Sequence, residues 1–127
     1  MKNPPNKKEQ GLLKGAIRRV FSRSELRRQV VEKSLVKEYF DPESPRVKKW
    51  FKCPECVKMI PAYKGQVDHQ EPLIPIDSSL EEMSWDEVVD RAWCNEDNLK
   101  LICIPCHKVK SKAENKERRR IKKEGKK

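Results

Sequence analysis

The segment E-D-N-L-K-L-I-C-I-P-C-H, residues 96–107, decides the fold together with C-P-E-C at 53–56 and V-D-H at 67–69. A C-x-x-C unit forms a tight knuckle with two thiolates, and two such units supply the four sulfurs of a tetrahedral structural zinc site. The spacing therefore predicts a Zn²⁺ site made by the four cysteines of these units, which are Cys53, Cys56, Cys103 and Cys106. The long interval between the units requires a substantial piece of chain to fold inside the loop that the metal closes.

The composition also favours a metal staple. The chain has 127 residues, of which 35% are hydrophobic and 39% are charged. A chain of this length holds one small core, and so polar a composition needs a metal or a disulfide to support it. The fifth cysteine, Cys94, follows Trp93 beside an acidic turn, and we interpret it as a small buried apolar residue rather than a ligand.

The N-terminal sequence and the hydropathy predict a cytoplasmic protein without membrane contact. Met1 is followed by polar residues instead of the apolar stretch of a secretory signal peptide. No run approaches the roughly 18 apolar residues of a membrane span. Thiols stay reduced in the cytoplasm, so the paired cysteines are expected to bind zinc rather than form disulfides.

The net charge of +10 is distributed unevenly along the chain. Residues 70–98 contain nine acidic residues and one basic residue, so this segment carries −8 and the remainder carries +18. A strongly basic remainder is the electrostatic footprint of a polyanion binder, and it predicts DNA as the partner. The alternative is that the charge serves solubility alone.

The N-terminal third is predicted to be basic and helical. Residues 1–8 form a disordered basic leader, and apolar residues then recur at helical spacing through a basic extension at 9–45. Ser22 and Glu25 form a capping-box pattern, so two helices are expected to meet there, with the second running towards Phe40 until Pro42 stops it. Arginines cluster near this junction as DNA-binding candidates, with a solvated helix face as the alternative: Arg18, Arg19, Arg23, Arg27 and Arg28.

The middle of the chain is predicted to alternate short strands with one helix. Trp50 and Phe51 belong to a strand that leads into the first knuckle, with both aromatic rings in the core. Residues 57–69 read as a hairpin that turns at 64–65 and ends at the V-D-H segment. A helix is expected over 80–93, capped by Ser79 and Glu82, with Met83, Val88, Val89 and Ala92 on its inner side. Its acidic outer face is a candidate surface for a protein partner.

The second knuckle is expected to join a short strand to a helix. Residues 99–102 alternate briefly, and Pro105 suits the first turn of a helix that carries His107 and Lys110. Lys110 is a further DNA-binding candidate. The basic tail at 116–127 is rich in Lys, Arg and Glu, so we expect it to fray.

The residues between and beside the knuckles fit phosphodiester hydrolysis. This reaction needs a base for water, a hard cation that stabilises charge on the phosphate, and groups that position both. Asp68 and His107 can bind the cation, His69 can be the base, and Asn98 can fix His69 by a hydrogen bond. The alternative is that these two histidines, the only ones in the chain, are structural.

The combination resembles the HNH endonuclease family, and in particular its small phage-type members with two C-x-x-C knuckles. The resemblance covers about residues 47–115 and implies an α+β fold in which a ββα-metal finger, stapled by a four-cysteine structural zinc, forms an HNH nuclease domain at 46–115. It implies that His69 is the general base and that Asn98 orients it. It also implies that Asp68 and His107 bind Mg²⁺ or another divalent cation, and that a phage-encoded member would act in the host cytoplasm.

The chain also departs from the family pattern. The family often has Ile and then Pro soon after Asp-His, whereas Gln70 and Glu71 follow here, and the acidic insertion is longer than the motif requires. Two alternatives to a nicking endonuclease therefore stay open. One is a non-catalytic, zinc-stabilised DNA-binding module, and the other is a DNA-packaging or recombination accessory protein that works through the acidic helix at 80–93. The sequence does not specify the oligomeric state.

Overall fold

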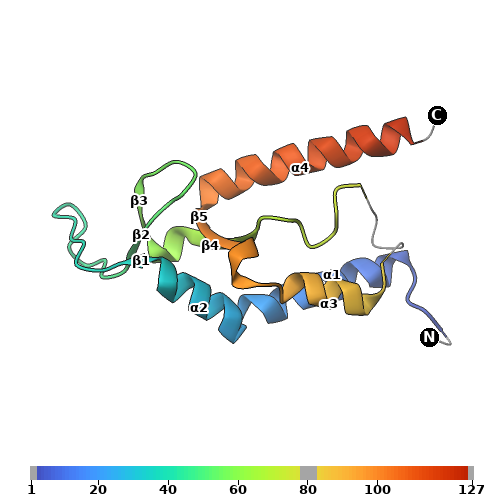
Figure 1. Ribbon diagram of the computed structural model, residues 1–127, viewed down its shortest axis with the longest axis horizontal. Helices are drawn as coiled ribbons and strands as arrows, with labels where there is room; N and C mark the ends of the chain where they lie inside the picture. Colours follow the sequence, from blue (N-terminus) through green and yellow to red (C-terminus); the bar gives the residue numbers. More distant parts are fainter. Residues whose placement is uncertain (1–2, 78–82, 126–127) are drawn as a thin grey trace.

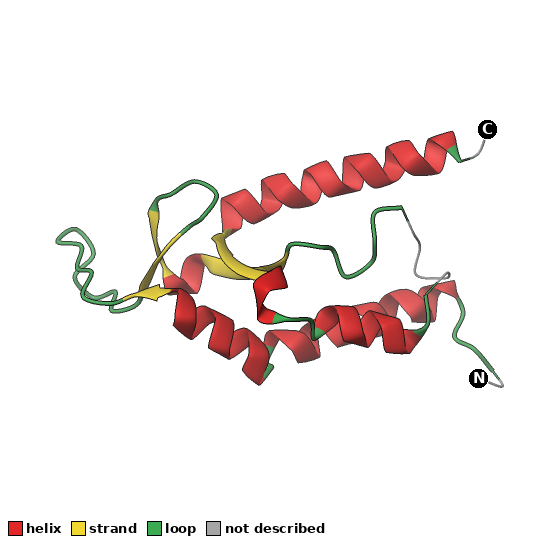
Figure 2. Ribbon diagram, in the orientation of Figure 1, coloured by secondary structure: helices red, strands yellow, loops and turns green. Residues whose placement is uncertain are grey.

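The computed structural model describes residues 3–77 and 83–125, and these form a mixed α+β fold with four α-helices and two small antiparallel sheets (Figures 1 and 2). In chain order the elements are α1 (Lys7–Ser22), α2 (Glu25–Ser34), β1 (Leu35–Val36), β2 (Trp50–Lys52), β3 (Met59–Pro61), η1 (Ala62–Lys64), β4 (Gly65–His69), α3 (Trp85–Ala92), η3 (Glu96–Asn98), β5 (Leu99–Cys103) and α4 (Ile104–Glu124). Among the described helices, none combines the length and the apolar composition needed to cross a bilayer.

The first helix begins earlier than the sequence suggests. Asn6 caps α1 by accepting a hydrogen bond from the Glu9 backbone N–H, and the Glu9 side chain returns a bond to the Asn6 N–H. This reciprocal capping box starts the helix at Lys7, inside the stretch expected to be disordered. The division into two helices is confirmed, but the predicted cap is wrong, because Ser24 caps α2 through the Arg27 N–H.

The second helix ends at Ser34, well before the expected Phe40. Leu35 adopts extended geometry, with φ −68° and ψ 135°, and pairs with Phe51 across β1 and β2. Strand pairing, rather than the prolines further along the chain, therefore terminates the helix.

The predicted hairpin over 57–69 is wrong. β3 pairs with β2, whereas β4 pairs with β5, and the 3-10 turn η1 separates the two strands. A hydrophobic strand pairs where it can also bury its side chains, and for β4 that partner is the distant strand β5. Residues 64–65 thus lie where the chain passes from one sheet to the other, instead of forming the turn of a hairpin.

β4, β5 and α4 form one continuous unit. The β4–β5 ladder runs from the pair Gly65↔Cys103 to the pair His69↔Leu99. The predicted strand before the second knuckle is confirmed, as is the helix that follows it with Pro105 in its first turn. α4 continues to Glu124, through the expected boundary between domain and tail.

The main core lies where the β4–β5 pair meets α2 and β2. Phe51 and Ile102 are fully buried there. Trp50 is also buried and donates from Nε1 to the Val47 carbonyl, so the predicted core role of both aromatics is confirmed. A smaller cluster joins Leu73 to Val88 and other residues of the α3 region.

α3 lies beside α1, while α4 runs along the opposite side of the molecule, with the loop at 70–77 between them (Figure 1). α3 begins at Trp85 and is capped by Ser84. The predicted capping pair, Ser79 and Glu82, lies outside the described residues. Of the expected inner positions, Val88 and Ala92 are buried, but Val89 is exposed.

Candidate functional site

The two knuckles converge as predicted. The Sγ atoms of Cys53, Cys56, Cys103 and Cys106 all lie within 4.8 Å of one another. The Sγ atoms of Cys56 and Cys103 are 3.8 Å apart. Tetrahedral zinc with bonds of about 2.3 Å places its sulfurs about 3.8 Å apart, whereas a disulfide needs about 2 Å. The four cysteines can therefore hold a structural metal ion such as zinc.

The thiol pKa values show why this cluster suits a cation. Burial raises the pKa of Cys53, but the backbone N–H groups of Cys103, Cys56 and Glu55 outweigh burial and lower it to about 7. The hydrogen bond with the Cys103 side chain, and then burial, raise the pKa of Cys106 to about 12. The Cys53 thiolate is thus stabilised at neutral pH, whereas ionisation of the Cys106 thiol needs a positive charge beside it. Cys94 stays outside the cluster and packs, half-buried, against the core.

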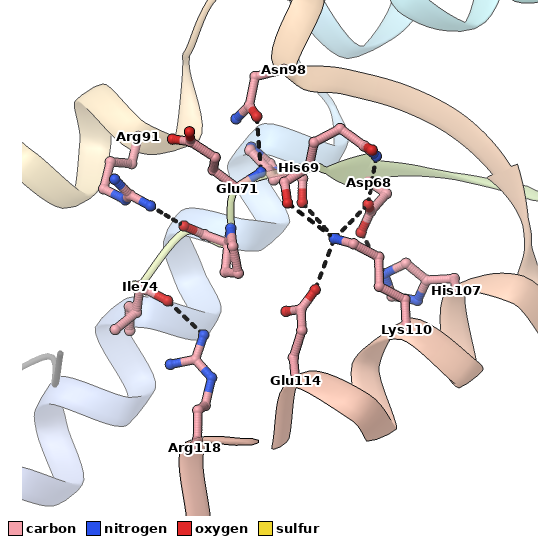
Figure 3. Close-up of polar contacts among 12 residues, drawn as sticks. Asp68, His69, Glu71, Ile74, Arg91, Asn98, His107, Lys110, Glu114 and Arg118 are labelled. Carbon is pink, nitrogen blue, oxygen red and sulfur yellow. Dashed lines mark hydrogen bonds and ion pairs between the residues drawn. The ribbon is translucent and has the colours of Figure 1, made fainter. Parts of the chain in front are cut away.

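At the other end of the ladder, Asp68 is the centre of a polar network (Figure 3). It is 6% exposed. Its Oδ1 lies 3.6 Å from His107 Nε2, and its Oδ2 lies 2.7 Å from Lys110 Nζ and 3.0 Å from Gln70 Nε2. One divalent ion with bonds of about 2.1 Å can span two donor atoms at the Asp68–His107 separation. The two predicted metal ligands therefore lie side by side, on β4 and α4.

Lys110 is part of this network, although the sequence placed it among the DNA-binding candidates. Its ammonium group contacts Asp68 and also lies 2.8 Å from Glu114 and 2.8 Å from the His69 carbonyl oxygen. Burial lowers the pKa of Lys110, but the hydrogen bonds to Asp68 and Glu114 outweigh it and raise the pKa above its ordinary value. Lys110 therefore connects α4 to the end of β4.

His69 is held by a partner that the sequence could not reveal. Its Nε2 lies 2.8 Å from the Ala92 carbonyl oxygen at the end of α3, and Phe21 packs against its ring with the centroids 4.7 Å apart. Because a carbonyl only accepts hydrogen bonds, Nε2 carries the proton in this contact. The neutral ring therefore keeps its lone pair on Nδ1, where it can accept a proton.

Asn98 does not have the contact that the sequence suggested. Among the residues that the structure describes, its side chain makes no hydrogen bond to His69. Its Oδ1 instead accepts from the Glu71 N–H at 2.8 Å, and its main-chain carbonyl accepts from the Gln70 N–H at 2.8 Å. Asn98 therefore braces the turn that follows His69, and the Ala92 carbonyl orients the ring.

A cleft of about 740 Å³ opens beside these residues, between α1, β4 and α4. Asp68, His69 and His107 all line it. Its charged and polar lining residues also include Lys14, Arg18, Ser22, Arg27, Gln66, Ser111, Glu114, Asn115 and Arg118.

The cleft divides the arginines predicted to bind DNA. Arg18 and Arg27 line it, whereas Arg19, Arg23 and Arg28 are exposed and, within the described chain, lie outside the lining. Two further lining cations, Lys14 and Arg118, were missed. Lys14 precedes Arg18 by one helical turn, so the i,i+4 spacing could have indicated it. Arg118 lies within a charge run and has no such signal.

Comparisons of the chain with protein-family models, with curated proteins and with solved structures each return no match. Its function is therefore inferred from the geometry of the site.

Proposed function

We propose that the protein is a metal-dependent endonuclease of the HNH type, in which β4, β5 and α4 form a zinc-stapled ββα-metal finger. One observation carries the proposal: His69, which can act as a base, and Asp68 and His107, which can bind a metal ion, line one basic cleft. Phosphodiester hydrolysis needs these groups within reach of one phosphate.

His69 is the general base in this proposal. The Ala92 carbonyl fixes the proton on Nε2, so Nδ1 is free to take a proton from the attacking water. Phe21 limits the movement of the ring. Asn98 acts on His69 indirectly, because it holds the backbone that follows His69.

Asp68 and His107 would hold the divalent cation, Mg²⁺ or a similar ion. When bound, that ion supplies charge stabilisation for the scissile phosphate and the departing oxygen. Lys110 holds the Asp68 carboxylate through Oδ2, which leaves Oδ1 facing His107. A chain with a single such site nicks one strand at a time.

The test is nicking of supercoiled plasmid with Mg²⁺, Mn²⁺ or Ni²⁺ by the wild type and by His69→Ala. Loss of the base is expected to slow nicking by roughly 10²- to 10⁴-fold. Glu43→Ala is the matched control, because Glu43 is an exposed residue in the segment between β1 and β2 and lies outside the cleft lining. Zinc content and melting temperature are measured for each protein. Equal nicking by wild type and His69→Ala would contradict the role of His69.

One observation favours a second candidate, a metal-stapled nucleic-acid-binding module without hydrolysis. The charge of Asp68 is already compensated by Lys110, with Gln70 as a further hydrogen-bond donor, so the network is stable without a divalent ion. In that case the wild type would bind DNA but would not nick it with any of the three metals.

A further inference from the structure

Three cations from two distant helices face the same cleft. Lys14 and Arg18 lie one turn apart on α1, and Arg118 comes from the last third of α4. Lys14 and Arg118 are half-buried. Like charges held together at a partly buried surface repel one another, so assembling this group carries an electrostatic cost in the folded chain.

The repulsion contributes to lowered pKa values of Lys14 and Arg18. Burial lowers the pKa of Lys14, and the charges of Arg18 and Arg118 lower it further. Burial and then Arg118 likewise lower the pKa of Arg18, while the charge of Glu114 acts in the opposite direction. Across the described ranges, 3–77 and 83–125, neither Lys14 nor Arg18 forms an ion pair with an acidic residue, so their charge is available to a ligand.

Arg118 is positioned by backbone oxygens instead of a counter-charge. Its Nη2 donates to the Ile74 carbonyl (Figure 3), and its Nη1 lies 3.4 Å from the Pro75 carbonyl. These bonds hold the guanidinium at the cleft wall against the loop at 70–77, and carbonyl acceptors leave its full charge in place. The acids that line the cleft, Asp68 and Glu114, both contact Lys110.

We propose that Lys14, Arg18 and Arg118 form a phosphate-binding subsite that holds the nucleic-acid backbone beside Asp68 and His107. The ligand is a phosphodiester, and Arg supplies the fork geometry that phosphate oxygens accept. Ser111 and Asn115 add neutral polar groups on the α4 wall of the same cleft. The placement of the scissile phosphate rests on the proposed function. Binding of the nucleic-acid backbone by these three cations does not depend on it.

Binding is tested with the zinc-loaded full chain and a fluorescent single-stranded DNA oligonucleotide, without added Mg²⁺, over a series of salt concentrations. Each cation that contacts a phosphate contributes about 0.7 to the slope of log K against log salt on single strands. Lys14→Gln and Arg18→Gln are each expected to reduce the slope by about that amount and to weaken binding about 5- to 10-fold. The test does not need Arg118 variants, which would also loosen the loop at 70–77.

The matched controls are Lys8→Gln on α1 and Arg119→Gln on α4, which remove the same charge from exposed positions outside the cleft. They are expected to change binding less than about 2-fold, because salt screens a charge that does not contact the bound phosphate. Equal weakening by the controls and the cleft variants would overturn the subsite, as would no weakening by the cleft variants. A second arm uses RNA of the same sequence. Equal losses on both nucleic acids would assign the contact to phosphate, and losses on DNA or RNA alone would restrict the ligand to that nucleic acid.

Nicking is measured separately, so the two proposals fail in different ways. A protein that shows the expected binding losses but never nicks DNA would overturn the nuclease and keep the subsite. A protein that nicks DNA but binds equally well after Lys14→Gln and Arg18→Gln would keep the nuclease and overturn the subsite.

Discussion

The two ends of the β4–β5 ladder differ in whether the protein itself supplies a positive charge beside their acidic groups. At the Gly65↔Cys103 end, four thiols face one another, and the raised pKa values of Cys103 and Cys106 oppose ionisation of these two thiols unless a cation is present. At the other end, Asp68 already has a cation, because Lys110 lies 2.7 Å from its carboxylate. The first end can therefore gain stability from a bound metal ion, whereas at the second end Lys110 already compensates the carboxylate and a metal ion would serve chemistry.

This contrast predicts that metal loss affects structure through the cysteines and not through Asp68. Cys103→Ser is expected to remove most of the free energy of unfolding, because structural zinc contributes about 10 kcal/mol or more in small zinc-stapled folds. Thermal unfolding followed by circular dichroism, with and without a chelator, measures the loss.

The matched control is Cys94→Ser, since Cys94 lies outside the cluster, packs half-buried against the core and accepts a weak hydrogen bond from Asn98 Nδ2 at 3.5 Å. It is expected to cost about 1 kcal/mol. The comparison breaks down if the two serine variants unfold at the same temperature, or if chelation leaves the wild type unchanged.

The ladder itself connects the two ends. Gly65 lies at its cysteine end, where there is little space for a side chain. A Cβ on Gly65 would lie 2.7 Å from Phe51 and 2.8 Å from Leu101. Gly65→Ala should therefore lower the free energy of unfolding by about 1–3 kcal/mol through overpacking. Urea unfolding measures this change.

Gly11→Ala is the opposite control, because a Cβ on Gly11 meets nothing within 4 Å inside α1. This substitution should stabilise the protein by about 0.5–1 kcal/mol through helix propensity. A destabilised Gly11→Ala together with an unaffected Gly65→Ala would show that the packing of β4 against Phe51 has been misassigned.

The same contrast explains what the sequence could predict. The cysteine cluster follows from ligand spacing, since C-x-x-C fixes each pair locally and the helix after Pro105 has its own start signal. The presence of short strands near 66–69 and 99–102 could also be predicted. The partners of β4 could not, because pairing depends on burial against β5, and no local signal marks that choice.

The interior of the candidate site shows a similar limit. Its side chains could be named from the sequence, but the Ala92 carbonyl that holds His69 belongs to the backbone and has no residue signature. Lys110 was predicted to bind DNA. Only the packing of α4 against β4 brings it to Asp68.

Asn98 tests whether the hydrogen bond to the Glu71 N–H stabilises the Asp68 end of the ladder. Asn98→Ala removes the acceptor for the Glu71 N–H and is expected to cost about 1 kcal/mol of stability. It should also slow any nicking, because the turn that follows His69 loses its brace. Urea unfolding and the plasmid assay measure the two effects.

Asn98→Asp serves as the control, since it keeps an oxygen at the same position and loses only the weak contact to Cys94. It should retain more stability and more activity than Asn98→Ala. Equal losses in both variants would mean that the acceptor is not what supports the turn.

The smallest expected effect concerns the cleft, where the folded protein tolerates repulsion between cations. Lys14→Gln should raise stability at pH 7 and low salt by a few tenths of a kcal/mol, or about 1 °C, since solvent screens much of the repulsion. The sign follows from the lowered pKa of Lys14, which burial, Arg18 and Arg118 cause. A lysine with a lowered folded pKa destabilises the protein while it is charged.

The penalty at Lys14 is relieved as pH rises from the folded pKa towards the ordinary value of 10.5. The difference in melting temperature between Lys14→Gln and wild type should therefore shrink with added salt and with rising pH. A variant that is less stable than wild type at pH 7 would mean that the Lys14 stem contributes more by packing than its charge costs, and that the cleft is not electrostatically strained at this position.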